Sequence, residues 1–432
     1  MIFRGQFRGR MRSVHPADAS GVRRRRIALL CLVVVALPSV ADGDLLRFDD
    51  PLASQQYHHD QMRFGEAWGT IHGLERRGQV TVAVLDSGFE TDHDDLGNNL
   101  MRGINIIDGS SDVSPVHPHG TGTSGIPGAI SGNASGVSQA ALTARVLPVR
   151  ISDRSDGAAY ISDIAQAIRF AADAGARIIN ISYGGVGNRT VAKAARYAYR
   201  KGALVFMAAG NSGLRTRWRN YRHIVAVGSI GSDNVRSNFS TYGRFVDFVA
   251  PGEQITTLYT DDDYADWDGT SFSSPIVASV ASLVLAANLE LSPAQVLRIL
   301  RKTATRLART RRGRIKRGRD KEYGYGLPDA QAAVEMALAT RGRYGRKLRR
   351  RGIDPYVEND WSPYAGIVST TAARASASAL VRPQGILRST ISARPAPEPG
   401  TLMLMLLALV ALALRPRRRT AVVRVPAPDR FG

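Results

Sequence analysis

Three side chains of this chain carry the functional groups of a nucleophilic catalyst: the carboxylate of Asp86, the imidazole of His119 and the hydroxyl of Ser271. Ser271 follows Gly-Thr and precedes an apolar run that starts near Pro275, so we expect it at a helix N-terminus. The free N–H groups and partial positive charge there favour a developing negative charge. Such a serine becomes a nucleophile when a base and an orienting acid lie beside it. By itself, it is better explained as a helix cap.

Asp86 and His119 are each ambiguous when taken alone. Asp86 closes the apolar run 80–85, which is typical of a strand buried on both faces. A carboxylate there is costly to bury unless it is hydrogen-bonded, although an Asx turn that ends a strand has the same signature. His119 has the context of an ordinary loop histidine. The chain order Asp, His, Ser is, however, one of the known orders of a catalytic triad, so the three residues support one another.

The elements that must position these residues alternate between strand and helix from about residue 80 to 340. Because alternation of this kind builds βαβ units, the sequence predicts an α/β fold with a mainly parallel central sheet flanked by helices. Catalytic side chains would then gather at the carboxyl ends of the strands. Beyond 80–85, strands are expected at 145–151, 177–181, 203–208, 224–227 and 245–249, and helices at 162–174, 190–200, 273–289 and 293–301.

Several short motifs, in order, resemble those of the subtilisin-like serine proteases (subtilases, peptidase family S8) over roughly residues 50–340. The resemblance implies a three-layer subtilisin-like fold and hydrolysis of peptide bonds through an acyl-enzyme. The motifs are Val84 to Gly88, His119 to Thr121, Asn180 to Gly185, Ala208 to Gly213 and Gly269 to Pro275.

The resemblance also implies a role for each residue. Ser271 would attack the scissile carbonyl, His119 would act as general base and Asp86 would orient the imidazole. Asn211 would donate its side-chain amide to the oxyanion, together with the Ser271 backbone N–H.

The segment Ser182-Tyr183-Gly184 resembles the strand that binds substrate in this family. It would pair with an extended peptide as an added strand, and Tyr183 would border the first pocket. We expect apolar or aromatic side chains in that pocket.

Two departures from the family pattern follow His119. Gly122 replaces a second histidine that is often found there, and Pro127 and Gly128 fall where the family has a helix. Because a proline inside a helix removes a hydrogen bond, either a displaced His119 or a short first turn is compatible with this sequence.

No cofactor is expected for the catalysis itself. Asp95 matches a calcium-binding aspartate of many relatives, which leaves a structural calcium ion possible.

Both ends of the chain resemble export signals. Arg23 to Arg26 precede the apolar stretch 27–37, which has the length of a signal-peptide core. The tail resembles the PEP-CTERM sorting signals of exopolysaccharide-producing Gram-negative bacteria: Pro-Glu-Pro at 397–399, an apolar run at 401–414 and a basic cluster at 415–419. This resemblance implies processing by an exosortase-like enzyme.

The sequence therefore predicts four regions. They are a signal peptide over 1–41, a subtilisin-like peptidase domain over 42–340, a basic then Ser/Ala-rich linker over 341–396, and a sorting or anchor segment over 397–432. The protein is expected to be exported to the cell envelope or beyond, with the C-terminal segment anchoring it transiently in the inner membrane.

The formal net charge of +21 does not indicate a nucleic-acid-binding fold. Of the 58 basic residues, 28 lie in four stretches, and the rest of the chain is slightly acidic. One stretch is the insert 309–319, which is either a solvated loop or a contact for anionic exopolysaccharide or membrane. The stretches are 1–26, 309–319, 341–351 and 415–432.

The sequence favours an exported serine endopeptidase that acts on surface or extracellular proteins. A catalytically impaired surface or matrix-binding protein that retains the fold is one alternative, and a processing protease with a single dedicated partner is another.

Overall fold

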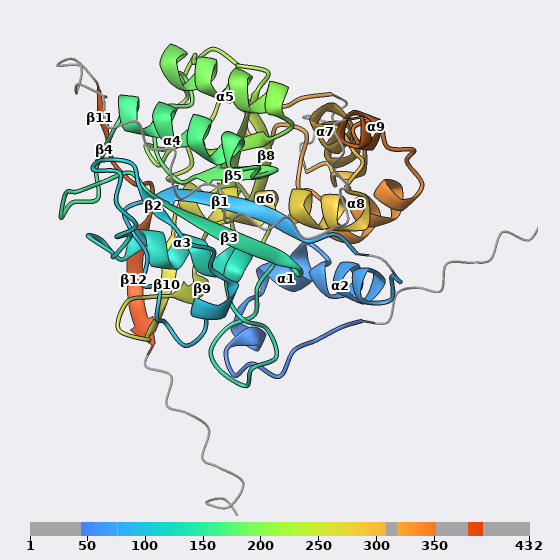
Figure 1. The fold of residues 1–432 in the computed structure, drawn as a ribbon, viewed down its shortest axis with the longest axis horizontal. Coiled ribbons are helices and arrows are strands. Elements are labelled where there is room, and N and C mark those ends of the chain that lie inside the picture. Colours follow the sequence, from blue (N-terminus) through green and yellow to red (C-terminus); the bar gives the residue numbers. More distant parts are fainter. Residues whose placement is uncertain (1–44, 76, 308–317, 351–378, 392–432) are drawn as a thin grey trace, which may run out of the picture. The chain divides into compact units, whose positions relative to one another are not determined.

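The computed structural model describes residues 45–75, 77–307, 318–350 and 379–391 (Figure 1). The predicted signal peptide over 1–41 and the sorting segment over 397–432 lie outside the described residues.

A seven-stranded sheet forms the centre of the molecule, and every neighbouring pair in it is parallel. This confirms the expected α/β class, and each strand and helix predicted between 80 and 301 is present. In spatial order the strands are β2 (Ile104–Asn105), β3 (Ala144–Arg150), β1 (Val80–Asp86), β5 (Ile178–Ile181), β6 (Leu204–Ala208), β7 (Ile224–Ile230) and β8 (Val246–Pro251).

Helices cover both faces of this sheet (Figure 1). On one face α4 (Ile161–Asp173) packs beside α5 (Arg189–Lys201), and on the other α3 (His119–Gly128) packs beside α6 (Thr270–Ala287). The outer helices are α1 (His58–Gln61), α2 (Phe64–His72), α7 (Pro293–Thr303), α8 (Ala330–Leu338) and α9 (Gly345–Arg349), with 3-10 turns at Ala53–Gln55 and Gly97–Asn99. The expected cap Ser292 forms a capping box with Gln295 at the start of α7.

Helix α6 runs through the core and brings Ser271 to the edge of the sheet. All of its residues are buried, and it lies against β1, β5, β6, β7 and β8. Among the described residues it is the one helix that is long and apolar enough to cross a membrane, but its complete burial identifies it as a core helix. Ser274 on its first turns donates to the Asn180 side chain, which ties α6 to β5.

Helix α3 forms in full despite Pro127, and the first of its residues is His119. The proline sits next to the last residue of the helix, where the loss of its N–H removes a single hydrogen bond. His119 keeps its hydrogen bond to Asp86, so this proline does not displace the imidazole.

The space beside Gly122 is filled by Trp267. A Cβ on Gly122 would lie 3.2 Å from the indole nitrogen of Trp267 and 3.1 Å from the carbonyl oxygen of Leu258. The glycine that departs from the family pattern therefore makes room for a buried tryptophan on β10 (Tyr264–Asp268).

Two smaller antiparallel sheets lie beside the main one. One has the order β12 (Ile386–Ile391), β10 (Tyr264–Asp268) and β9 (Ile255–Leu258), and the other pairs β11 (Leu380–Val381) with β4 (Ala159–Tyr160). The solvated linker predicted over 341–396 is thus corrected in part. Backbone hydrogen bonding to existing strands orders 380–391, and Glu290 binds Arg349 of α9.

Most of the basic insert 309–319 lies outside the described residues, but its last residue is anchored. The Arg319 guanidinium donates to the carbonyl oxygens of Val246 and Phe245 and pairs with the buried Asp247 at 3.1 Å. Burial raises the pKa of Asp247, and Arg319 and Arg301 oppose that rise. This arginine is therefore structural.

The close approach of α3 to β1 gives a test of the fold. A methyl group at Gly120 would collide with the carbonyl oxygen of Gly88 and lie 3.2 Å from Cβ of Asp86. We expect Gly120→Ala to lower the free energy of unfolding by about 1–3 kcal/mol, measured by chemical denaturation. Gly73→Ala is the matched control, because its added Cβ meets no atom of the described residues closer than 3.6 Å. Equal stability of the two variants would contradict this account of the α3–β1 contact.

Candidate active site

The sequence-predicted site residues lie together at one edge of the sheet. Asp86 is the last residue of β1, Ser182 follows β5 and Asn211 follows β6, so parallel strands carry all three to the same edge. The first residue of α3, His119, and the second residue of α6, Ser271, reach this edge from the helices.

Asp86 and His119 form a completely buried pair. Oδ1 of Asp86 lies 2.8 Å from Nδ1 of His119 and accepts from the Ser87 backbone N–H at 2.8 Å and the Ser87 hydroxyl at 3.1 Å. Oδ2 accepts from the hydroxyl of Thr123 at 3.1 Å. These donors compensate the cost of burying the carboxylate and fix the imidazole with Nε2 turned away from Asp86.

The other imidazole nitrogen is free for proton transfer. Nε2 of His119 is buried and has no hydrogen-bond partner among the described residues. The Ser271 hydroxyl donates to the carbonyl oxygen of Ser182 at 3.0 Å. Among the described residues no hydrogen bond joins this hydroxyl to His119, so the proton transfer needs a rotation about χ1 of Ser271.

The orientation of the Asn211 amide is fixed by Thr270. Oδ1 of Asn211 accepts from the Thr270 backbone N–H at 3.0 Å and from its hydroxyl at 2.8 Å. Because both donors lie on the oxygen side, the amide nitrogen points toward Gln384. Nδ2 and the Ser271 backbone N–H both donate there to one carbonyl oxygen, that of Gln384, at 2.6 and 3.1 Å.

The predicted substrate-binding strand lies along the cleft. Ser182 donates its hydroxyl to the carbonyl oxygen of Ser271 at 2.7 Å, and Gly184 faces Val381 and the Gln384 side chain. The Tyr183 ring is completely buried against His119, and its hydroxyl donates to the carbonyl oxygen of Gly157 at 2.7 Å. Its backbone bridges to Pro383, while its side chain packs on the triad side.

Comparison with known proteins gives this geometry a context. The model of the subtilase family matches residues 77–326, which include Asp86, His119, Asn211 and Ser271. The chain belongs to the subtilase family. The PEP-CTERM protein-sorting motif matches residues 395–419 and implies export with a C-terminal sorting signal that anchors in a membrane.

Curated relatives of this subtilase are serine proteinases. It is 39% identical over 221 residues to the thermophilic serine proteinase of Bacillus sp. strain AK1, covering 50% of this chain and 54% of that protein. Thermitase of Thermoactinomyces vulgaris is 35% identical over 240 residues, 55% of this chain and 84% of the relative. The chain thus spans about half the length of the first relative and most of the second.

Solved structures give the same family likeness. Proteases from Pseudoalteromonas arctica PAMC 21717 align with a TM-score of 0.56 at 27% identity, over 67% of this chain and 99% of that one. A lanthipeptide protease aligns with a TM-score of 0.55 at 28% identity, over 65% and 93%. The subtilisin-like fold and the serine-protease assignment are confirmed.

Two residues of the subtilase site were not predicted from the sequence. Thr123 lies one helical turn after His119 on α3, and this i,i+4 spacing was the available signal. Trp267 stacks on Phe272, and its ring is nearly perpendicular to that of His119, at 87°. For Trp267, the available signal in the sequence was the glycine at position 122, which leaves space for a large side chain.

Asp95 lies away from the cleft, and its oxygens are occupied. Oδ1 accepts from the Asn133 side-chain amide at 3.0 Å and Oδ2 from the Val137 backbone N–H at 2.9 Å. Burial raises the pKa of Asp95 to about 7, although the N–H donors oppose that rise. N–H groups aimed at both oxygens do not suit a cation, and the described residues contain no group of three or more acidic, His or Cys ligands.

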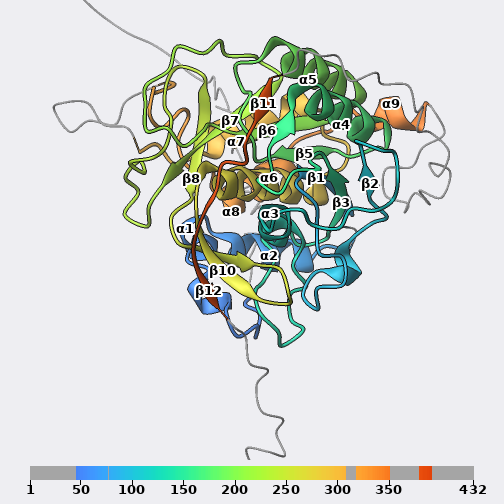
Figure 2. The same ribbon diagram turned by 90° about the vertical axis from the view of Figure 1, so that its left-hand side faces the viewer.

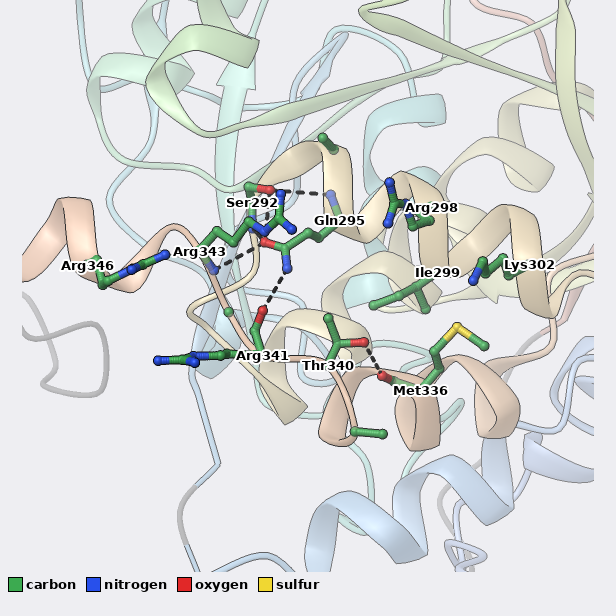
Figure 3. A pocket seen from close by; sticks show the side chains of 13 residues that line it. Ser292, Gln295, Arg298, Ile299, Lys302, Met336, Thr340, Arg341, Arg343 and Arg346 are labelled. Atoms are coloured by element: carbon green, nitrogen blue, oxygen red, sulfur yellow. Dashed lines mark hydrogen bonds between the residues drawn. The ribbon is translucent and has the colours of Figure 1, made fainter.

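A basic groove lies apart from the active site, between α7, α8 and the segment 341–346 (Figure 3). Gln295 bridges its two sides, since its amide donates to the carbonyl oxygen of Arg341 at 2.8 Å and accepts from the Arg343 backbone N–H. Its cationic side chains are Arg298, Lys302, Arg341, Arg343 and Arg346.

Thr123 gives a test of the electrostatics around Asp86. Thr123→Val keeps the shape but removes a hydroxyl donor from the buried carboxylate, so we expect kcat on a peptide substrate to fall about tenfold. We expect KM to stay unchanged, because the Thr123 side chain is completely buried and hydrogen-bonds to Asp86. Thr81→Val on the same strand as Asp86 is the control and should leave kcat unchanged. A change in KM without a change in kcat would contradict the proposed role of the Thr123 hydroxyl beside Asp86.

Proposed function

We propose that this protein is an exported serine endopeptidase that cleaves surface or extracellular proteins through an acyl-enzyme. The observation that carries the proposal is the convergence of two N–H donors, from Asn211 and Ser271, on one carbonyl oxygen beside the buried Asp86–His119 pair. A site that stabilises an oxyanion next to a base and a hydroxyl is equipped for acyl transfer.

In the proposed reaction Ser271 Oγ attacks the scissile carbonyl carbon while His119 Nε2 takes the hydroxyl proton. His119 then gives that proton to the leaving amine, and Asp86 stabilises the imidazolium without accepting the proton itself. The tetrahedral oxygen is stabilised by the Asn211 amide and the Ser271 backbone N–H. Water hydrolyses the acyl-enzyme by the same steps in reverse.

Substrate is proposed to bind as an added strand along Ser182-Tyr183-Gly184. The Ser182 carbonyl oxygen already accepts a backbone N–H from an extended segment, and an antiparallel bridge joins Tyr183 to the same segment. Tyr183 contributes its backbone, whereas its ring holds the imidazole in place.

The PEP-CTERM motif favours an exosortase-like enzyme as a processing partner. We further propose that the mature protein lies in the cell envelope or outside the cell, after transient anchoring in the inner membrane. Calcium is not part of this proposal, because Asp95 is surrounded by hydrogen-bond donors.

We propose that the basic groove binds an anionic exopolysaccharide. The insert 309–319 suggested such contacts from the sequence, and the groove adds five described cations between α7, α8 and the segment 341–346. Exposed charges of one sign attract polyanions in a way that salt screens.

Charge reversal tests the groove. We expect the double variant Arg298→Glu, Arg343→Glu to bind polygalacturonate about tenfold more weakly in low-salt calorimetry, with casein cleavage unchanged. Arg102→Glu reverses an exposed charge elsewhere and should bind as the unmodified protein does. Equal affinity of the double variant and the control would remove the groove from the proposal.

Covalent labelling tests the catalytic proposal against a non-catalytic, matrix-binding subtilase fold. A fluorophosphonate probe should label the protein at Ser271, and Ser271→Ala should lose both labelling and casein cleavage. Ser282→Ala is the matched control, because Ser282 is a buried serine of the same helix whose hydroxyl has no hydrogen-bond partner in the part of the chain that the structure describes. Absence of labelling and cleavage in the unmodified protein would favour the binding function instead.

A further inference from the structure

The segment 379–391 runs from β11 to β12 (Figure 2), and Gln384 within it contacts Asn211 and Ser271 of the candidate active site. At one end β11 pairs with β4, and at the other β12 pairs with β10. Between these ends Pro383 forms an antiparallel bridge with Tyr183 of the proposed substrate-binding strand. The segment is therefore extended and held by backbone pairing on both sides of residues 384 and 385, as a bound peptide would be.

Gln384 lies where a scissile residue would lie. Its carbonyl oxygen accepts from the Asn211 side-chain amide at 2.6 Å and from the Ser271 backbone N–H at 3.1 Å. Its own N–H donates to the carbonyl oxygen of Ser182 at 3.0 Å. Three hydrogen bonds thus present the Gln384 carbonyl to the nucleophile in the geometry of a substrate.

The Gln384 side chain is held by polar contacts. Its oxygen accepts from the Asn211 backbone N–H at 3.0 Å, and its nitrogen donates to the carbonyl oxygen of Arg382 at 3.0 Å. The segment therefore presents an uncharged polar side chain to the first pocket, where the sequence favoured apolar or aromatic ones.

Gly385 continues the segment over the imidazole. A Cβ at this position would lie 3.0 Å from Nε2 of His119 and 2.8 Å from the Phe272 ring. Only a residue without a side chain fits this close, and it brings the backbone after residue 384 against the nitrogen that must protonate a leaving amine.

We propose that this protein cleaves its own chain between Gln384 and Gly385, and that the segment blocks the cleft until it does. This inference rests on the proposed function. Ser271 Oγ bonds to the Gln384 carbonyl carbon, and the proton passes through His119 to the Gly385 nitrogen as the C–N bond breaks. Water then hydrolyses the Gln384 ester and restores the Ser271 hydroxyl, so one water is consumed for one peptide bond.

Cleavage here would separate the catalytic body from residues 385–432, which contain the sorting motif 395–419. The enzyme would thus free itself from its own sorting and anchoring segment. Residues 379–384, which keep only their pairing with β4 and Tyr183, would then be held in the site less firmly. Because the scissile bond is already held in the site, the reaction is intramolecular and does not depend on protein concentration.

Intact-mass spectrometry of the purified full-length chain tests the inference. We expect products that end at Gln384 and begin at Gly385, formed with a rate constant that is unchanged over a hundredfold range of protein concentration. Ser271→Ala should remain whole. Fluorophosphonate labelling should lag and then rise as the cleaved form accumulates.

Two valine variants on the segment sharpen the test. Gly385→Val should slow self-cleavage on the order of tenfold or more, because its side chain overlaps His119 and Phe272. Its melting temperature reports whether it folds. Ser389→Val adds the same side chain at an exposed position of β12 and should cleave itself at the unmodified rate.

The outcomes separate this inference from the proposed function. If the protein is labelled by the fluorophosphonate and cleaves casein but keeps the Gln384–Gly385 bond intact, self-cleavage is overturned and the protease function is retained. A rate that rises with protein concentration overturns the intramolecular step. A chain that neither labels, cleaves casein nor cleaves itself refutes the protease function as well.

Discussion

The hydrogen bond between Asp86 and His119 is the interaction on which the rest of the site depends. Both side chains are completely buried, so the carboxylate needs a full set of donors. The imidazole, the Ser87 N–H and hydroxyl, and the Thr123 hydroxyl supply them. Satisfying Asp86 therefore requires the first turn of α3 to lie against the end of β1, and that contact requires glycine at position 120.

The same constraint shapes the surroundings of the imidazole. Three aromatic rings surround the His119 ring and exclude water from it, with ring centroids no more than 6.2 Å from its own. They belong to Tyr183, Trp267 and Phe272. A low-dielectric site of this kind strengthens the effect of fixed donors on a developing charge. Helix α6 contributes both to the core and to the site. Its residues are buried in the core, and its N-terminus places Ser271 at the sheet edge.

Much of this arrangement was predictable because parallel strands and their order impose it. Buried apolar runs gave β1, β3 and β5 to β8, and the topology of βαβ units places their carboxyl ends at one edge. The pairing of 380–391 was not predictable. Apolar and polar residues alternate only weakly along this segment. Its strands form because β4 and β10 each have an unpaired edge with which it hydrogen-bonds. Hence the linker expected over 341–396 proved partly ordered.

The sequence by itself determined the α/β fold and the family, and it supplied Asp86, His119, Asn211 and Ser271 as candidate site residues, because these depend on local periodicity and on motif order. Only the tertiary structure decided how their atoms face one another. It alone placed Trp267 in the space of Gly122, turned the Asn211 amide through Thr270 and laid Gln384 across the cleft. The physical reason is that such contacts join segments up to 173 residues apart, whose spacing leaves no periodic trace in the sequence.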